Sequence, residues 1–150
     1  MNRKLLLIPV LAAAFTAACD LMVFDTPPFI ITKPVSETAA RQHYFSYAGI
    51  TFEFMNTTET AVKNITVSFS LFDAKTGRNP FMGSNIFEIT TACEIQPDEI
   101  RKIILSLDSY IHIKPSEPFL IDNFCVREIQ YSNGNVWQDR YGIFTGGVLK

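Results

Sequence analysis

One stretch of the chain constrains its fold more than any other. Between residues 65 and 71 apolar and polar side chains alternate, with Ile65, Val67, Phe69 and Leu71 interleaved by Thr66, Ser68 and Ser70. Successive side chains of a β-strand point to opposite faces, so this period of two predicts a strand with one buried face. The same period recurs in two other places, at Ile50, Phe52 and Phe54 and at Ile103, Leu105 and Leu107.

Turn-forming residues separate further apolar runs. We expect strands at 29–33, 44–55, 65–71, 86–93, 103–107, 119–131 and 136–141, and a helical turn or loop at 36–42. In the sixth of these strands Val126 and Ile129 are three residues apart, which a β-bulge near Arg127 would reconcile. About seven short strands with regular turn signals predict an all-β fold, a single β-sandwich over residues 29–150.

The N-terminus has the features of a signal peptide. Basic residues at Arg3 and Lys4 precede an apolar run from Leu5 to Phe15 that is too short to span a bilayer. We therefore expect residues 1–18 to be a cleaved signal peptide. If no lipid is attached, an ordinary signal peptidase cleaves after Ala17 and Ala18, and Cys19 remains a free thiol.

The sequence Thr16-Ala17-Ala18-Cys19 resembles the lipobox of bacterial lipoproteins, although Thr16 stands where Leu, Val or Ile is usual. The resemblance implies a diacylglyceryl thioether on Cys19 and usually a further acyl chain on its amine. Two or three chains make membrane anchoring stable. Residues 19–28, which include Pro27 and Pro28, are then a tether, and the protein faces the periplasm or the cell surface from the inner or the outer membrane.

Removal of Arg3 and Lys4 with the signal peptide changes the formal net charge from −2 to −4. Nucleic acid binding rewards clustered Lys and Arg, so this mildly acidic chain is not expected to bind it.

Once Cys19 is assigned to lipid, Cys93 and Cys125 remain. An even number of cysteines in an oxidising compartment favours a disulfide, which would stabilise the fold by roughly 3–4 kcal/mol. We expect the two residues to be neighbours that face one core; the alternative is two separate buried thiols. Neither has a Cys or His partner at ligand spacing, so no metal or other cofactor is expected.

Four short segments also resemble a known family. Phe69-Ser70-Leu71-Phe72-Asp73 matches the F-x-L-[YF]-D motif of FxLYD-type domains of bacterial envelope proteins. In order along the chain, Asn56 to Glu59 is similar to the Asn-x-Ser/Thr turn of that family, Ile95 to Glu99 to its I-x-P-G-E turn, and Tyr131 to Trp137 to its Y-x-D-G-x-x-W hairpin. Asp98 replaces the usual Gly, and Asn133 replaces Asp. The resemblance spans residues 49–137 and implies an immunoglobulin-like sandwich on secreted or lipid-anchored proteins, with no catalytic residues.

The chain offers few groups for catalysis. His43 and His112 are its only histidines, and its carboxylates at Asp98, Asp122 and Asp139 are not paired by spacing. We therefore do not expect an enzyme. A cleft that brings His43 together with acids would favour one.

An apolar loop tip is the feature most suggestive of binding. Pro80, Phe81 and Met82 lie in a loop otherwise built of turn residues, and they are the candidates for contact with a partner. In the alternative, Phe81 folds back against the end of the sandwich. The expected function is a non-catalytic interaction module for another envelope or host protein; the alternative is an accessory or inhibitor subunit of an envelope enzyme or transport complex.

Overall fold

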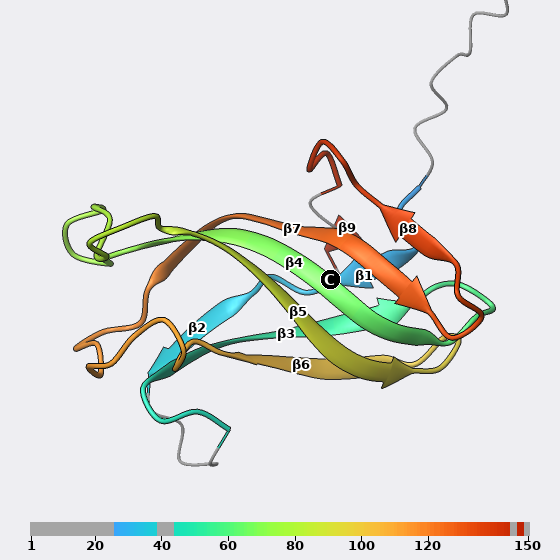
Figure 1. Ribbon diagram of the computed structural model, residues 1–150, viewed down its shortest axis with the longest axis horizontal. Helices are drawn as coiled ribbons and strands as arrows, with labels where there is room; N and C mark the ends of the chain where they lie inside the picture. The colour runs from blue at the N-terminus through green and yellow to red at the C-terminus, as the bar shows by residue number, and fades with distance from the viewer. Residues whose placement is uncertain (1–25, 39–43, 145–146, 149–150) are drawn as a thin grey trace, which may run out of the picture.

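The protein consists of two β-sheets packed face to face (Figure 1). The structure is a computed structural model that describes residues 26–38, 44–144 and 147–148. The first sheet contains β1 (Phe29–Ile31), β2 (Val35–Thr38), β3 (Ala48–Asn56), β6 (Ile100–Ser106) and β9 (Gly147–Val148). The second contains β4 (Val62–Phe72), β5 (Ile86–Ile95), β7 (Leu120–Tyr131) and β8 (Val136–Gln138). The described residues form no helix, and the predicted all-β sandwich is confirmed.

Each sheet is built around one long strand. In the first sheet β6 pairs with residues 49–55 of β3, while β2 and β1 follow one another along the opposite edge of β3, at 48–51 and 54–56. β9 adds to β1 in parallel. The second sheet has the order β5-β4-β7-β8, and all its pairs are antiparallel. The strand with the clearest alternation, β4, is therefore interior.

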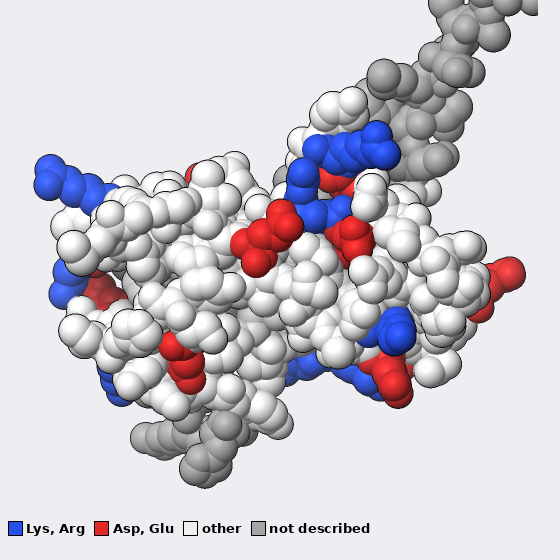
Figure 2. Space-filling model, in the orientation of Figure 1, with Lys and Arg blue, Asp and Glu red and all other residues white. Residues whose placement is uncertain are grey.

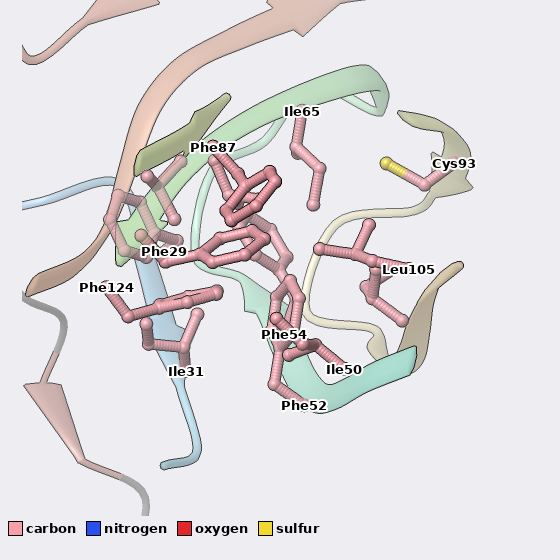
Figure 3. Close-up of a cluster of buried hydrophobic side chains, with 14 of the residues drawn as sticks. Phe29, Ile31, Ile50, Phe52, Phe54, Ile65, Phe87, Cys93, Leu105 and Phe124 are labelled. Atoms are coloured by element: carbon pink, nitrogen blue, oxygen red, sulfur yellow. The ribbon is translucent and has the colours of Figure 1, made fainter. Parts of the chain in front are cut away.

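The alternating residues of β4 form the centre of the core. Ile65, Val67, Phe69 and Leu71 are each at most 1% exposed. The ring of Phe69 stacks on Phe87 and Phe124, with centroids 5.7 and 6.0 Å apart. Side chains from β3 and β6 face them across the sandwich, among them Ile50, Phe52, Phe54 and Leu105 (Figure 3). Burial of these large apolar side chains is the main source of stability for a fold of this kind.

The predicted irregularity in β7 is a β-bulge at Arg127. Thr66 pairs with Glu128, but the next residue, Val67, pairs with Val126, so Arg127 is left without an opposite residue in β4. Because the bulge inserts one residue, Val126 and Ile129 both face the core in spite of their spacing, and each is 0% exposed.

Two short strands were not expected. Val35–Thr38 forms β2 where the sequence indicates a helical turn or a loop, and β9 was not foreseen. In β2 only Ser36 is buried, because the strand lies at the edge of β3, so it lacks the apolar alternation that marks an interior strand. With these two, the described strands number nine instead of about seven.

The predicted disulfide is wrong: Cys93 and Cys125 are both free and buried. They lie on β5 and β7, which flank β4 on opposite sides, and Cys125 pairs with Ser68 whereas Cys93 lies beyond the pair of Ala92 and Asn64. The Cys93 thiol points into the core cluster (Figure 3). The Cys125 thiol lies on the other face of its sheet, beside Arg127, because Phe124 and Val126 take the core-facing positions. Burial raises the pKa of both thiols, that of Cys93 to about 11.

Residues 1–25 lie outside the described residues, and with them the predicted signal peptide of residues 1–18, the predicted lipidation site Cys19 and most of the predicted tether 19–28. The first strand begins at Phe29. None of the described segments is a helix long and apolar enough to cross a membrane.

Candidate functional site

The two ends of the sandwich differ in the length of their connections. At the end where the chain enters β1, which we call the proximal end, the connections between strands are short. At the opposite end lie residues 73–85, between β4 and β5, and residues 107–119, between β6 and β7 (Figure 1). We call these two segments the distal loops. Loops held by a rigid scaffold commonly carry binding residues, so the distal loops are the first region to consider.

Asp73 shapes the beginning of the first distal loop. Its Oδ1 accepts hydrogen bonds from the backbone N–H groups of Lys75 and Thr76, at 3.1 and 2.8 Å, and from the Thr76 hydroxyl. The Thr76 backbone N–H, followed by the Thr76 hydroxyl, holds the pKa of the Asp73 carboxyl below its usual value. Gly77 follows with φ +64°, a left-handed conformation that suits glycine, and its N–H donates to the Asp73 carbonyl at 2.9 Å.

Asn79 holds the apex of the same loop. Its Oδ1 accepts the N–H of Phe81 at 2.8 Å, and its Nδ2 donates to the carbonyl of Gly83 at 2.7 Å. The Asn79 side chain thus bonds to the backbone on both sides of the apex. The side chains of Phe81 and Met82 point in different directions from this apex.

Of the three apex residues singled out as candidates for partner contact, Phe81 is half-buried. Its ring packs edge-on against Phe87 at 5.0 Å and lies 5.7 Å from Phe119, so the alternative in which it folds back describes the structure. Pro80 is exposed, and Met82 is 110% exposed relative to its reference value. Phe81 therefore packs the apex against the end of the sandwich, and Met82 is the most exposed apolar side chain of the apex.

The second distal loop is joined to the first. Lys75 and Glu117 form an ion pair of 2.9 Å, and the Tyr110 ring packs edge-on against Phe87 at 5.1 Å. Asp108 fixes the loop to the scaffold by accepting the N–H groups of Ser46 and Tyr47 at 2.6 and 2.9 Å. Both loops are therefore anchored to the sandwich as well as to each other.

A groove of about 500 Å³ runs between the distal loops. Its apolar lining includes Pro80, Phe81, Met82, Tyr110, Ile113 and Phe119. Tyr110 is 46% exposed and Ile113 is 83% exposed. Sequence reasoning missed these two residues because they stand in a Pro-rich loop without periodicity. The charged residues Arg78 and Lys114 are exposed in the distal loops, and neither takes part in an ion pair within the described residues.

A second groove, of about 390 Å³, lies on the outer face of the second sheet. Positive and negative side chains gather on this face (Figure 2), and Glu88, Arg127, Glu128, Asp139 and Arg140 line the groove. Two of these side chains, Arg127 and Glu128, form hydrogen bonds within the protein. Glu128 accepts amide hydrogen bonds from Gln130 and Gln138 at 2.7 and 2.9 Å, and Arg127 donates to the carbonyl of Arg140 at 3.0 Å.

Asp139, which is 4% exposed, lines this second groove. Burial raises the pKa of its carboxyl, but the N–H groups of Phe144, Ile143 and Tyr141 outweigh burial and hold the pKa below its usual value. The carboxylate thus fixes the chain after β8. This use of its oxygens leaves the distal groove as the stronger candidate for binding.

The two histidines do not form a site with the acids. His43 lies outside the described residues, and His112 is an exposed residue at the edge of the distal groove. Among the residues that the structure describes, no group of three His, Cys, Asp or Glu side chains is arranged to hold a metal ion.

Comparison of the chain with protein-family models, curated proteins and solved structures finds no match.

Proposed function

We propose that this protein is a lipid-anchored protein of the bacterial cell envelope, and that its domain is a non-catalytic interaction module of the immunoglobulin-like FxLYD type. It faces the periplasm or the cell surface and binds another envelope or host protein through the distal loops. The basic and apolar N-terminal segment that ends at Cys19 supports the anchoring.

Three of the segments that resemble the family each contain a residue with a clear structural role. This agreement supports the proposed domain type. Asn56 is 0% exposed and bonds the residues of its own turn. Asp98 has φ +58°, a conformation that suits the Gly of the family turn. Trp137, at the end of the hairpin segment, packs edge-on against Phe29 at 5.4 Å.

The observation that carries the binding function is the exposed apolar surface of the distal loops. Met82 and Ile113 are the two most exposed large apolar side chains of the described residues, and they flank one groove. Exposed apolar groups on a stiff support are typical of protein interfaces. With Arg78 and Lys114 nearby, the surface fits a partner that presents apolar side chains next to carboxylates.

Binding is tested with two matched double variants. Met82→Ser with Ile113→Ser removes apolar surface from the distal groove, whereas Val136→Ser with Ile100→Ser removes it from the proximal end, where both side chains are 52% exposed. A partner captured from envelope extract is purified and titrated against the full chain. We expect the distal variant to weaken binding at least ~10-fold, because buried apolar contacts dominate interface energies, and the proximal variant to leave it unchanged. Equal effects of the two variants would refute the site.

The anchor is tested at Cys19. Cys19→Ala should move the protein to the soluble fraction and abolish labelling by a fatty-acid probe, because no acyl chain can be attached. Continued labelling of the variant in the membrane would refute lipidation.

The hydrogen bonds of Asn79 favour a second candidate function, that of an inhibitor or accessory subunit. They stiffen the apex that carries Met82, and a stiff protruding loop suits insertion into the cleft of an enzyme or transport complex. This candidate predicts that the partner loses activity when the wild-type chain is added, and keeps it with Met82→Ser.

A further inference from the structure

The second sheet ends in a strand whose outer edge is open. Within the described residues β5 pairs with β4 and with no other strand. Its sequence, IFEITTACEI, contains no Lys, Arg or Pro, and its only charged residues are Glu88 and Glu94. Other edges are better protected, since β8 has three residues and β6 carries Arg101 and Lys102.

The register identifies the backbone groups that face this edge. Hydrogen-bonded and non-hydrogen-bonded pairs alternate along an antiparallel ladder. The Leu71 N–H donates to the Asn85 carbonyl at 2.9 Å, so this pair is of the hydrogen-bonded type. Counting along the register from it, the N–H and C=O groups of Glu88, Thr90 and Ala92 point away from β4.

Ser84 closes the beginning of the open edge. The Ile86 N–H donates to Ser84 Oγ at 3.0 Å, and the Ser84 hydroxyl donates to the Ile86 carbonyl at 3.4 Å. The next three residues that face the edge, Glu88, Thr90 and Ala92, are exposed. The available edge is therefore short and centred on Thr90.

We propose that two copies of this protein associate by antiparallel pairing of their β5 strands about a two-fold axis at Thr90. Glu88 of one copy then lies opposite Ala92 of the other, and Thr90 lies opposite Thr90. Each open N–H group meets an open C=O group, and the two second sheets become continuous. A two-fold interface requires this kind of self-complementarity.

Neighbouring registers are less favourable, which favours this arrangement of two copies. A shift of two residues in one direction places Glu88 opposite Glu94, and like charges directly opposite one another destabilise a sheet. A shift in the other direction uses Ile86, whose backbone groups are already bonded to Ser84. The register centred on Thr90 avoids both costs and adds a favourable Thr–Thr pair.

Cysteine cross-linking in the membrane-bound full chain tests both the association and its register. Opposite residues in a hydrogen-bonded pair have Cα atoms about 5.5 Å apart, within the range that a disulfide bridges. Under mild oxidation Thr90→Cys should give a covalent dimer. Glu88→Cys and Ala92→Cys should each stay monomeric alone and cross-link to each other when they are expressed together with different tags. The wild-type chain, whose Cys93 and Cys125 are buried, gives the background.

Thr90→Pro provides an independent check. It removes the central N–H of the open edge and no backbone bond to β4; the one side-chain bond lost is that between the Thr90 and Thr66 hydroxyls, 2.8 Å apart. It should therefore reduce the Glu88→Cys to Ala92→Cys cross-link at least ~10-fold while Trp137 fluorescence reports an unchanged fold. Absence of the Thr90→Cys dimer, or cross-linking of Glu88→Cys to itself with equal yield, would overturn the proposal. Neither result bears on the distal groove, which lies on other residues.

Discussion

The proximal and distal ends of the sandwich use their polar side chains differently. At the proximal end Asn56 is buried and donates to the carbonyls of Thr60 and Ile95, so polar groups hold a short turn inside the fold. At the distal end Asp73 and Asn79 shape a loop that stays at the surface. A loop can therefore be held in shape by its own hydrogen bonds without being buried. This leaves Met82 free to contact a partner.

The largest difference between a core residue and the distal loops should come from two phenylalanines. Phe69→Ala removes a side chain that is 1% exposed and should cost roughly 3–5 kcal/mol through lost burial and the cavity left behind. Phe81→Ala, at a half-buried position, should cost roughly 1–2 kcal/mol. Urea unfolding followed by Trp137 fluorescence measures both. Equal losses would place Phe81 in the main core and contradict the distinction.

Two asparagines compare the ends directly. Asn56→Ala leaves buried backbone groups without partners, including the Ile95 carbonyl, and should cost roughly 2–3 kcal/mol. Asn79→Ala should cost about 0.5–1 kcal/mol, because water can replace its bonds at the exposed apex. The same unfolding measurement applies, and a larger loss for Asn79→Ala would reverse our assignment of the two ends.

Each end also has a residue with positive φ. Substitution of these two residues should change the stability of the fold in opposite directions. Asp98→Gly at the proximal end relieves a left-handed conformation at φ +58° and should stabilise the fold by about 0.5–1 kcal/mol. Gly77→Ala at φ +64° introduces the same strain in the distal loop and should cost about 1–2 kcal/mol. Thermal unfolding of both variants checks the signs; destabilisation by Asp98→Gly would show that its side chain has a further role.

The smallest difference between the two ends is expected at low pH, where each end should lose stability through one carboxylate. The Gln96 backbone N–H and the Arg101 side chain hold the pKa of Glu99 below its usual value, as the Thr76 groups do for Asp73. A carboxyl whose pKa is lowered by folding adds stability above its unfolded pKa, and this contribution is lost as pH falls through the folded pKa. Glu99→Gln and Asp73→Asn should therefore each flatten the loss of stability below about pH 4.5. If either variant lost stability with falling pH as steeply as the wild type, the proposed contribution of that carboxylate would be contradicted.

Much of the fold was predictable because the interior strands bury one face. The alternation from Ile65 to Leu71 reflects that burial, and the three-residue spacing of Val126 and Ile129 located the bulge at Arg127. Edge strands follow a weaker rule. β2 buries one side chain and leaves no periodic signal, so the sequence at this position indicates a helical turn or a loop instead of a strand.

The site was less predictable, since it depends on contacts between segments distant in sequence. The loop tip at Met82 was identified from its composition, but Tyr110 and Ile113 join it only because β4 to β7 bring the two loops to one end. The cysteine pairing failed for a related reason. Phe124 takes the core-facing position in β7, so its neighbour Cys125 faces away from Cys93.

Photo-crosslinking in living cells tests the claim that the distal end is the binding end. A photoreactive amino acid is placed singly at Met82, at Ile113 and, as the proximal control, at Val136, all exposed in the free chain. Crosslinks form only across direct contact, so we expect the same protein adduct from positions 82 and 113 and none from position 136. An adduct from position 136 alone, or equal adducts from all three positions, would contradict the claim.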